Sequence, residues 1–223
     1  IVNAENVHDG SGLDRNDANE LFNSGADVLT GGNHSFRRYA AFELYEDEET
    51  VLRPLNFPQR SAGNGYCIVP IKNGLRALII SVCGQVFMDP VDSPFYTVDR
   101  LLEAQKGKYD IAICDFHGEA TSEKQAFMHY FDGRIQIVFG THTHVQTADE
   151  RLTSRGSGYI SDVGMCGSED SVIGVTYETA LPRFTDNIRM KGIPASESIN
   201  LCGAVFEIDE KSGRTVSLRR ISF

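Results

Sequence analysis

The sequence predicts a layered α/β fold with a mixed sheet, and three observations support this prediction. In the first two thirds of the chain, short apolar runs rich in Val and Ile alternate with stretches whose apolar residues recur at helical spacing. Two Gly-containing turns each separate a pair of apolar runs, as in a β-hairpin. The length of 223 residues, without an internal repeat, is sufficient for one large domain with a buried core.

The first part of the chain predicts strands and helices in alternation. A helix over 14–24 places Ala18, Leu21 and Phe22 on one face, and Gly25 follows as a C-terminal stop. The other elements expected here are the strands 1–2 and 28–30, the helix 36–45 and an irregular stretch over 53–65 that is interrupted by Pro and Gly.

The second part adds two hairpins and a strand–helix–strand unit. Asn73-Gly74 between apolar runs predicts the first hairpin. Ser122 with Gln125 fits a capping box that opens a helix ending at Phe131. The remaining expected elements are the hairpin strands 65–71 and 75–82, the helix 98–105, the strands 111–116, 135–139 and 159–160, a helical turn over 176–181, and a second hairpin of 204–208 with 215–221.

Composition narrows the class of function. The formal net charge of -10 argues against a groove for long nucleic acid, which needs clustered Lys and Arg. No apolar run approaches the roughly 20 residues that span a bilayer, so no membrane segment is expected. The five cysteines are odd in number and form no CxxC pair, which favours reduced thiols and a cytoplasmic protein.

Polar side chains follow four of the apolar runs. Glu5-Asn6 comes after the first run, Asn33-His34 after the second, His117 after the run that begins at Ile111, and His142 with His144 after the run that ends at Phe139. Strand ends that deliver imidazoles, amides and a carboxylate toward one rim of a sheet indicate a metal site. Histidines two residues apart on an extended segment project the same way, so both can approach neighbouring ions.

This set of ligands suits a two-metal hydrolase. Such enzymes hold two ions about 3.5–4 Å apart and need one bridging carboxylate with several neutral ligands. His34, beside the amide of Asn33, is an imidazole able to protonate a leaving alkoxide. Each of these motifs can also be explained without a metal. A His-x-His pair occurs by chance, and Asn-His after Gly-Gly can be a plain turn. Three other residues are set aside as solvent-exposed or structural: His8, His129 and Cys166.

Two long strings carry a resemblance to a known family. Residues 115–124 (Asp-Phe-His-Gly-Glu-Ala-Thr-Ser-Glu-Lys) and 140–149 (Gly-Thr-His-Thr-His-Val-Gln-Thr-Ala-Asp) resemble the YmdB-like branch of the calcineurin-type metallophosphoesterases. Shorter motifs over 3–6, 32–34, 53–58, 84–88 and 161–165 are also similar to that family. The resemblance covers essentially the whole chain, and it implies one metallophosphoesterase domain over 1–223 with a four-layer α/β/β/α sandwich.

The resemblance also implies two divalent transition metal ions, commonly Fe or Mn, and a phosphodiesterase of small phosphoesters such as 2′,3′-cyclic nucleotides. A metal-bridging hydroxide would attack phosphorus, and His34 would be the general acid. Carried over by motif, the metal ligands are Glu5 as the bridge, Asn6 and His144 on one ion, and Asn33, His117 and His142 on the other.

The sequence departs from the family pattern at three places. The family begins with a strand ending in Gly-Asp, whose Asp binds the first metal, whereas this sequence begins at Ile1 without Met. We therefore expect an N-terminally incomplete domain that lacks the first strand and helix. Phe36-Arg37 replaces the usual Trp-Asp, and Gln85 replaces an Arg. The missing Asp and Arg37 favour one alternative, a catalytically weak nucleotide-binding regulatory module. A phosphomonoesterase on the same centre is a second alternative, and the sequence leaves a homo-oligomer possible.

Overall fold

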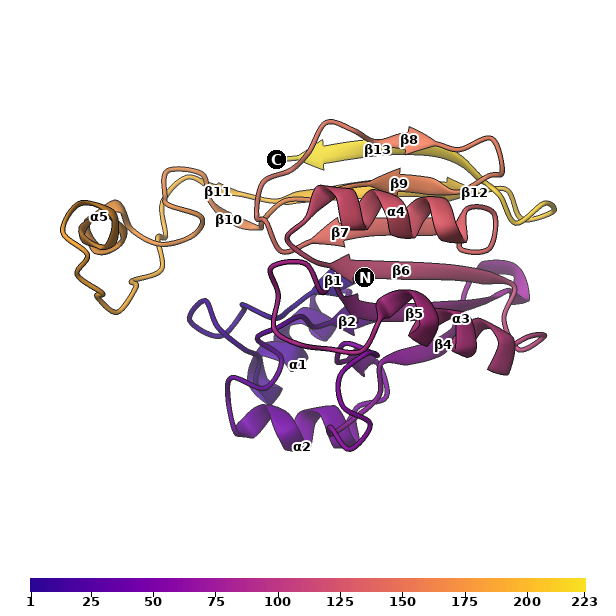
Figure 1. Cartoon of the computed structure of the whole chain (residues 1–223), viewed down its shortest axis with the longest axis horizontal. Helices are drawn as coiled ribbons and strands as arrows, with labels where there is room; N and C mark the ends of the chain where they lie inside the picture. The colour runs from indigo at the N-terminus through magenta and orange to yellow at the C-terminus, as the bar shows by residue number, and fades with distance from the viewer.

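The computed structural model describes residues 1–223, which form four layers in the order helices, sheet, sheet, helices (Figure 1). Four apolar clusters fill the spaces between the layers. One joins the six-stranded sheet to the helices α3 and α4, two lie between the two sheet layers, and one joins the small N-terminal sheet to α1 and α2. The predicted α/β class and its four-layer form are confirmed.

The six-stranded sheet has the order β4-β5-β6-β7-β9-β8. Its four central strands are parallel, and the edge strands β4 and β8 are antiparallel to their neighbours. Every residue of β5 after Arg76 is buried, as expected for a strand covered on both faces. The strands are β4 (Tyr66–Pro70), β5 (Arg76–Cys83), β6 (Ile111–His117), β7 (Ile137–Thr141), β8 (Arg151–Leu152) and β9 (Gly158–Ile160).

The other sheet layer consists of two parts. One part is a parallel sheet of β1 (Val2–Asn3), β2 (Leu29–Thr30) and β3 (Val51–Leu52), and the other is the separate C-terminal hairpin of β12 (Cys202–Ile208) and β13 (Thr215–Ser222). Both predicted hairpins are confirmed, and the turn of the first is a short 3-10 segment over Lys72–Gly74.

The helices agree with the prediction in place, but their starts differ. α1 (Arg15–Asn23) is capped by Asp14 and Asp17, and Gly25 adopts a φ of 101° just after it. α2 (Ala40–Asp47) begins four residues later than predicted, because the chain over 33–36 forms a turn. α3 (Pro94–Ala104) begins earlier, with Pro94 in its first turn.

The capping box predicted at Ser122 is wrong. α4 (Thr121–Phe131) has Ala120 at its N-cap without a side-chain cap. Glu123 is buried instead, and its carboxylate accepts hydrogen bonds from the backbone N–H groups of Gln85 and Val86. The Glu123 side chain therefore holds the loop after β5 in place and does not cap the helix.

Residues 165–200 form an arm that extends away from the sheets (Figure 1). The short strands β10 (Gly167–Ser168) and β11 (Ile199–Asn200) pair at its base, and α5 (Tyr177–Thr185) lies toward its end. None of the helices combines the length and apolarity that crossing a bilayer requires.

Candidate metal centre

Three loops and the end of one strand bring the predicted ligands to one edge of the sheets. β1 and β2 are parallel, as are β6 and β7, and His117 at the end of β6 pairs in register with Thr141 at the end of β7. The loops that follow β1, β2 and β7 supply the other predicted residues: Glu5, Asn6, Asn33, His34, His142 and His144. The structure connects all seven predicted site residues through contacts of 2.7–3.3 Å.

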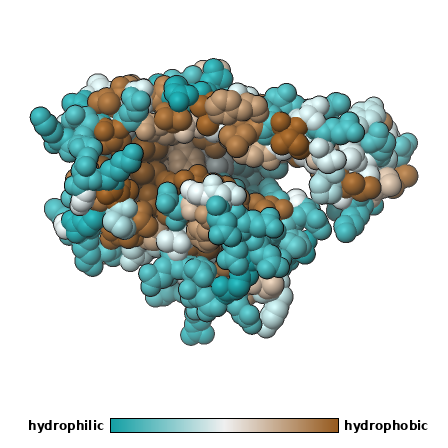
Figure 2. All heavy atoms as spheres, turned by 180° about the vertical axis from the view of Figure 1, so that it is seen from behind, coloured by the Kyte–Doolittle hydropathy of each residue, from teal (hydrophilic) through white to brown (hydrophobic).

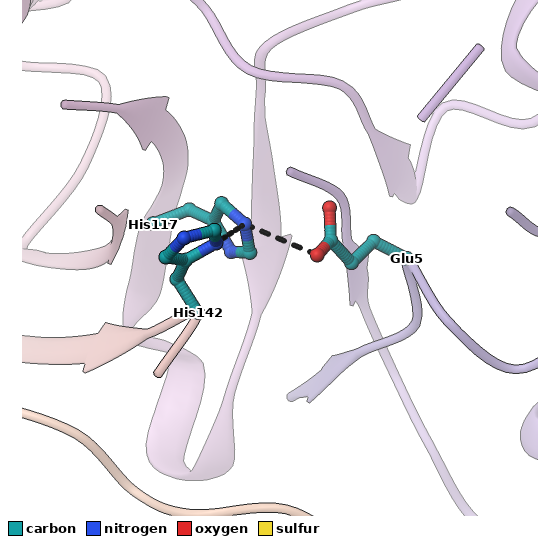
Figure 3. A group of neighbouring side chains, drawn as sticks. All are labelled: Glu5, His117 and His142. Carbon is teal, nitrogen blue, oxygen red and sulfur yellow. Dashed lines mark hydrogen bonds and ion pairs between the residues drawn. The ribbon is translucent and has the colours of Figure 1, made fainter. Parts of the chain in front are cut away.

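Glu5 contacts His117, His34 and Asn6, and Figure 3 shows its carboxylate facing the His117 ring. The Glu5 side chain is 2% exposed, one carboxylate oxygen lies 3.1 Å from His117 Nε2, and the other accepts a hydrogen bond from the backbone N–H of His34 at 2.9 Å. Burial opposes its ionisation, but the hydrogen bond and charge of His117 and the N–H of His34 outweigh burial and lower the pKa of Glu5 to about 2. Glu5 is therefore a carboxylate at neutral pH.

His117 offers one nitrogen to three neighbours. Its Nε2 lies 3.1 Å from Glu5, 2.9 Å from Asn33 Oδ1 and 3.1 Å from His142 Nδ1. An imidazole nitrogen carries either one proton or one lone pair, so it cannot satisfy two oxygens and a second imidazole together. Convergence of such donor atoms is typical of a cation site, and ligand atoms of Glu5, His117 and His142 all lie within 4.8 Å of one another.

The second half of the network lies around Asn6. Its side-chain oxygen is 2.7 Å from His34 Nδ1, and its side-chain nitrogen lies 3.3 Å from both His144 Nε2 and Glu5 Oε1. His142 and His144 adopt positive φ angles of 101° and 67°. Such angles are rare for residues other than Gly, so the surrounding structure must stabilise this loop.

The buried carboxylate of Asp115 orients His117 through the hydroxyl of Thr141. Thr141 Oγ1 lies 2.9 Å from His117 Nδ1 and donates to Asp115 at 2.7 Å. Asp115 is fully buried and also accepts hydrogen bonds from Asn3 and Thr30. Burial raises the pKa of Asp115, although these bonds oppose the change. Sequence reasoning missed this support, although the spacing of two residues on one strand places Asp115 and His117 on the same face.

A carboxylate also contacts His142, at the ring nitrogen that does not face His117. Its Nε2 lies 3.1 Å from the carboxylate of Glu119, while its Nδ1 faces His117. Burial, with a smaller effect of His117, lowers the pKa of His142, so the neutral ring that metal binding requires is favoured. A carboxylate on the second nitrogen of a ligating His is a common arrangement at metal sites.

A buried ion pair holds the loop that carries His142 and His144. Lys124, which is 1% exposed, donates from Nζ to the carbonyl of Thr141 at 2.8 Å and lies 3.2 Å from Asp162. Asp162 accepts from the backbone N–H and the hydroxyl of Thr143 at 3.0 and 2.9 Å. Sequence reasoning assigned no role to either charge, because the pairing joins α4 to the loop after β9 and leaves no local signal.

Gly32 leaves room at the centre. A Cβ at this position would lie 2.3 Å from Glu5 Oε2 and 2.4 Å from His117 Nε2. Only a residue without a side chain allows the backbone to approach these donor atoms so closely. The buried carboxylate, the converging imidazoles and this close backbone approach all fit bound metal.

The residues that the sequence set aside lie outside the network. His8 pairs with Asp17 at 2.9 Å and Asp14 at 3.2 Å at the start of α1. His129 is exposed on α4, and the thiol of Cys166 points to a backbone carbonyl.

The model of one protein family, described as YmdB-like protein, matches residues 1–221 of this chain. The chain belongs to the YmdB-like family. This match covers nearly every residue, including all seven residues of the network, and it confirms the resemblance that the two long strings carry.

Three relatives show how widely the YmdB-like fold is shared. A Bacillus subtilis protein named 2′,3′-cyclic-nucleotide 2′-phosphodiesterase is 39% identical over 99% of this chain and 83% of its own length. A solved structure of a hypothetical protein from Thermus thermophilus has a TM-score of 0.94 at 38% identity, covering 100% of this chain and 86% of that one. A solved structure from Mycoplasma pneumoniae, described as a novel phosphatase, has a TM-score of 0.93 at 32% identity, with coverage of 100% and 81%.

Proposed function

We propose that this protein is a metal-dependent hydrolase that cleaves small phosphate diesters such as 2′,3′-cyclic nucleotides. One observation carries the proposal: side chains from three loops and the end of β6 form one network around Glu5 and His117, and Glu5 is a buried carboxylate with a pKa of about 2. The names of the Bacillus and Mycoplasma relatives support action on phosphate esters.

The network divides into two groups that would each hold one divalent ion. Glu5 contacts both groups and would bridge the ions. Asn33, His117 and His142 would complete the shell of one ion, and Asn6 and His144 would bind the other. Imidazole nitrogens mixed with amide and carboxylate oxygens suit transition metals such as Fe or Mn. When bound, two such ions supply a nucleophile at neutral pH and clamp the phosphoryl oxygens.

His34 would protonate the leaving oxygen. Its Nδ1 is held at 2.7 Å by Asn6 Oδ1, so Nε2 remains available to a substrate, and the side chain is 29% exposed at the rim of the site. Burial lowers the pKa of His34, while Glu5 acts in the opposite direction.

The net charge of the protein favours a small substrate over a long polyanion. A protein with a net charge of -10 repels long polyanions, whereas a small diester meets the local positive charge of bound ions. A phosphomonoesterase on the same centre is a second candidate, because the Mycoplasma relative is described as a phosphatase.

The five cysteines are all unpaired, which supports a reducing, cytoplasmic location.

Replacing His34 with Ala tests the proposal. We expect the variant to keep its metal but to hydrolyse 2′,3′-cyclic AMP at least about 100-fold more slowly, the usual contribution of a general acid. His129→Ala, an exposed histidine on α4, is the matched control and should retain full activity. Unchanged turnover in His34→Ala would remove the assigned role. Comparing the rate for 2′,3′-cyclic AMP with that for 3′-AMP separates a diesterase from a monoesterase.

A further inference from the structure

Phe87 has a larger exposed fraction, 88%, than any other large hydrophobic residue of the chain. On the face shown in Figure 2, hydrophilic side chains form most of the outline of the molecule, while apolar side chains gather in a hollow of the body. The Phe87 ring projects into solvent and belongs to none of the four apolar clusters. Single exposed apolar residues are common on protein surfaces, so exposure alone assigns no role to this ring.

The backbone of Phe87 is strained. Its φ angle is 61°, in the left-handed region. Gly, Asn and Asp are the residues that favour this region, and a bulky aromatic residue is an outlier there. Such a conformation persists only where the surrounding structure enforces it, and it is concentrated at active sites and ligand clamps. The chain between β5 and α3, residues 84–93, which we call the β5–α3 loop, must therefore hold Phe87 in place.

Two buried polar side chains hold the β5–α3 loop in this shape. Asn56, which is 1% exposed, ties its two ends together, because the side-chain amide donates to the carbonyls of Cys83 and Asp92 at 2.7 and 2.8 Å. The carboxylate of Glu123 accepts hydrogen bonds from the backbone N–H groups of the two residues before Phe87 at 2.9 and 3.1 Å. The loop therefore presents the Phe87 ring in one place before any ligand arrives.

The β5–α3 loop lies beside the candidate metal centre. β5 and β6 are parallel, so the loop leaves the sheet at the edge where His117 lies, to which the arrowheads of β6 and β7 point in Figure 1. The backbone N–H of Gly84 donates to the carbonyl of His117 at 2.8 Å. Met88, next to Phe87 in the chain, lines a small pocket together with Asn33. The loop thus forms the rim of the site beside two proposed ligands of one ion.

We propose that Phe87 is a platform on which the nucleobase of the substrate stacks. The inference rests on the proposed hydrolysis of 2′,3′-cyclic nucleotides. In such a molecule the cyclic phosphate and the base are attached to different carbons of the ribose, so a base platform must lie beside the phosphate site, as Phe87 does. Every base has a π-face, so an aromatic side chain accepts all four bases with little preference among them. Phe87 would therefore favour nucleotides over diesters that have no base.

Stacking should contribute to binding and not to the chemical step. The base takes no part in the cleavage of the P–O bond, so its contact with Phe87 is the same in the bound substrate and in the transition state. Loss of such a contact raises KM and leaves kcat unchanged. The fixed loop strengthens the contact, because an ordered side chain loses less conformational entropy when the base binds.

Replacing Phe87 in the full-length, metal-loaded protein tests the platform with two substrates. One is 2′,3′-cyclic AMP, and the other is methyl riboside 2′,3′-cyclic phosphate, which carries a methoxy group in place of the base. Phe87→Ala should lower kcat/KM for 2′,3′-cyclic AMP about 5–150-fold through KM, equivalent to about 1–3 kcal/mol, and should leave the base-free substrate unchanged. Phe87→Gly, which accepts a positive φ without strain, should show the same loss. Tyr96→Ala, which removes another exposed ring on α3, is the control and should change neither rate.

A binding measurement tests the same contact without hydrolysis. The chain contains no Trp, so Phe87→Trp introduces a single fluorophore at the platform. An indole keeps the stacking face, so this variant should retain activity, and 3′-AMP should quench its fluorescence while ribose 3-phosphate should not. Tyr96→Trp places the same fluorophore outside the loop, and neither compound should quench it.

Three results would overturn the inference. These are an unchanged kcat/KM of Phe87→Ala for 2′,3′-cyclic AMP, an equal loss with both substrates, and fluorescence of Phe87→Trp that 3′-AMP leaves unchanged. An equal loss would mean that the ring supports the fold or the metal centre, which circular dichroism and metal content measure for each variant. Failure of the proposed function is a different result, because the wild type would then hydrolyse neither substrate, while the fluorescence titration would still report on base binding.

Discussion

Replacing Lys124 with Met should destabilise the protein and loosen the loop that carries His142 and His144. Lys124 is 1% exposed, and its ammonium group holds Thr141 and Asp162. Removing one partner of a buried ion pair typically costs about 3–5 kcal/mol, because the remaining charge stays buried. Asp162 keeps its two hydrogen bonds from Thr143, so we expect the lower end, about 3 kcal/mol.

The assay is thermal unfolding of metal-free protein, followed by metal titration. For a protein of this size, 1 kcal/mol shifts the melting temperature by about 2–4 °C, so Lys124→Met should lower it by about 6–12 °C. The exposed Lys106→Met is the control and should change it little. The double variant Lys124→Met with Asp162→Asn should lose less stability than the sum of the single losses, since the two charges interact. Additive losses, or a single loss below about 1 kcal/mol, would refute this reasoning.

Three further predictions concern other parts of the molecule. Gly32→Ala should abolish metal binding, because its Cβ would lie 2.3 Å from the carboxylate of Glu5; calorimetric titration with Mn²⁺ measures this, and wild-type affinity would contradict it. Thr141→Val should weaken metal binding about 10–100-fold in the same titration, since its hydroxyl orients His117, a proposed metal ligand. Asp149→Asn should lower the free energy of urea unfolding more at pH 7 than at pH 3. Burial opposes ionisation of Asp149, yet hydrogen bonds led by Ser161 lower its pKa, so the carboxylate stabilises the fold above its unfolded pKa of about 3.9 and loses this effect as the pH falls. An equal loss at both pH values would rule out this origin.

The fold could be predicted where local patterns decide it. Asn73-Gly74 forms the predicted turn, with Asn73 at a φ of 61°, and the apolar run of β5 is buried as predicted. The capping box at Ser122 failed because α4 begins one residue earlier, with Ala120 as its N-cap. The local pattern also could not show that Glu123 contacts a loop almost forty residues earlier in the chain. The sequence predicted only a helical turn over 176–181 in the arm. The helix found there, α5, contains Pro182 and buries only Thr179, so it has no clear apolar face.

The candidate site was predictable in composition and in place. Parallel strands end at one edge of a sheet, so Asn33, His117 and His142 could be expected to meet there, and they do. The support behind them was not predictable, because Lys124 and Asp162 resemble ordinary surface charges in the sequence. Their burial, and that of Asp115, depends on how the layers pack.

The most direct test of the two-metal proposal is metal analysis of the full-length protein together with hydrolysis of 2′,3′-cyclic AMP. We predict about two transition metal ions per chain, and loss of hydrolysis when chelation removes them, with recovery on adding Mn²⁺ or Fe²⁺. Replacing Glu5 with Gln should lower the metal content and the rate together. Undiminished hydrolysis by metal-free protein, or full metal content and activity in Glu5→Gln, would contradict it.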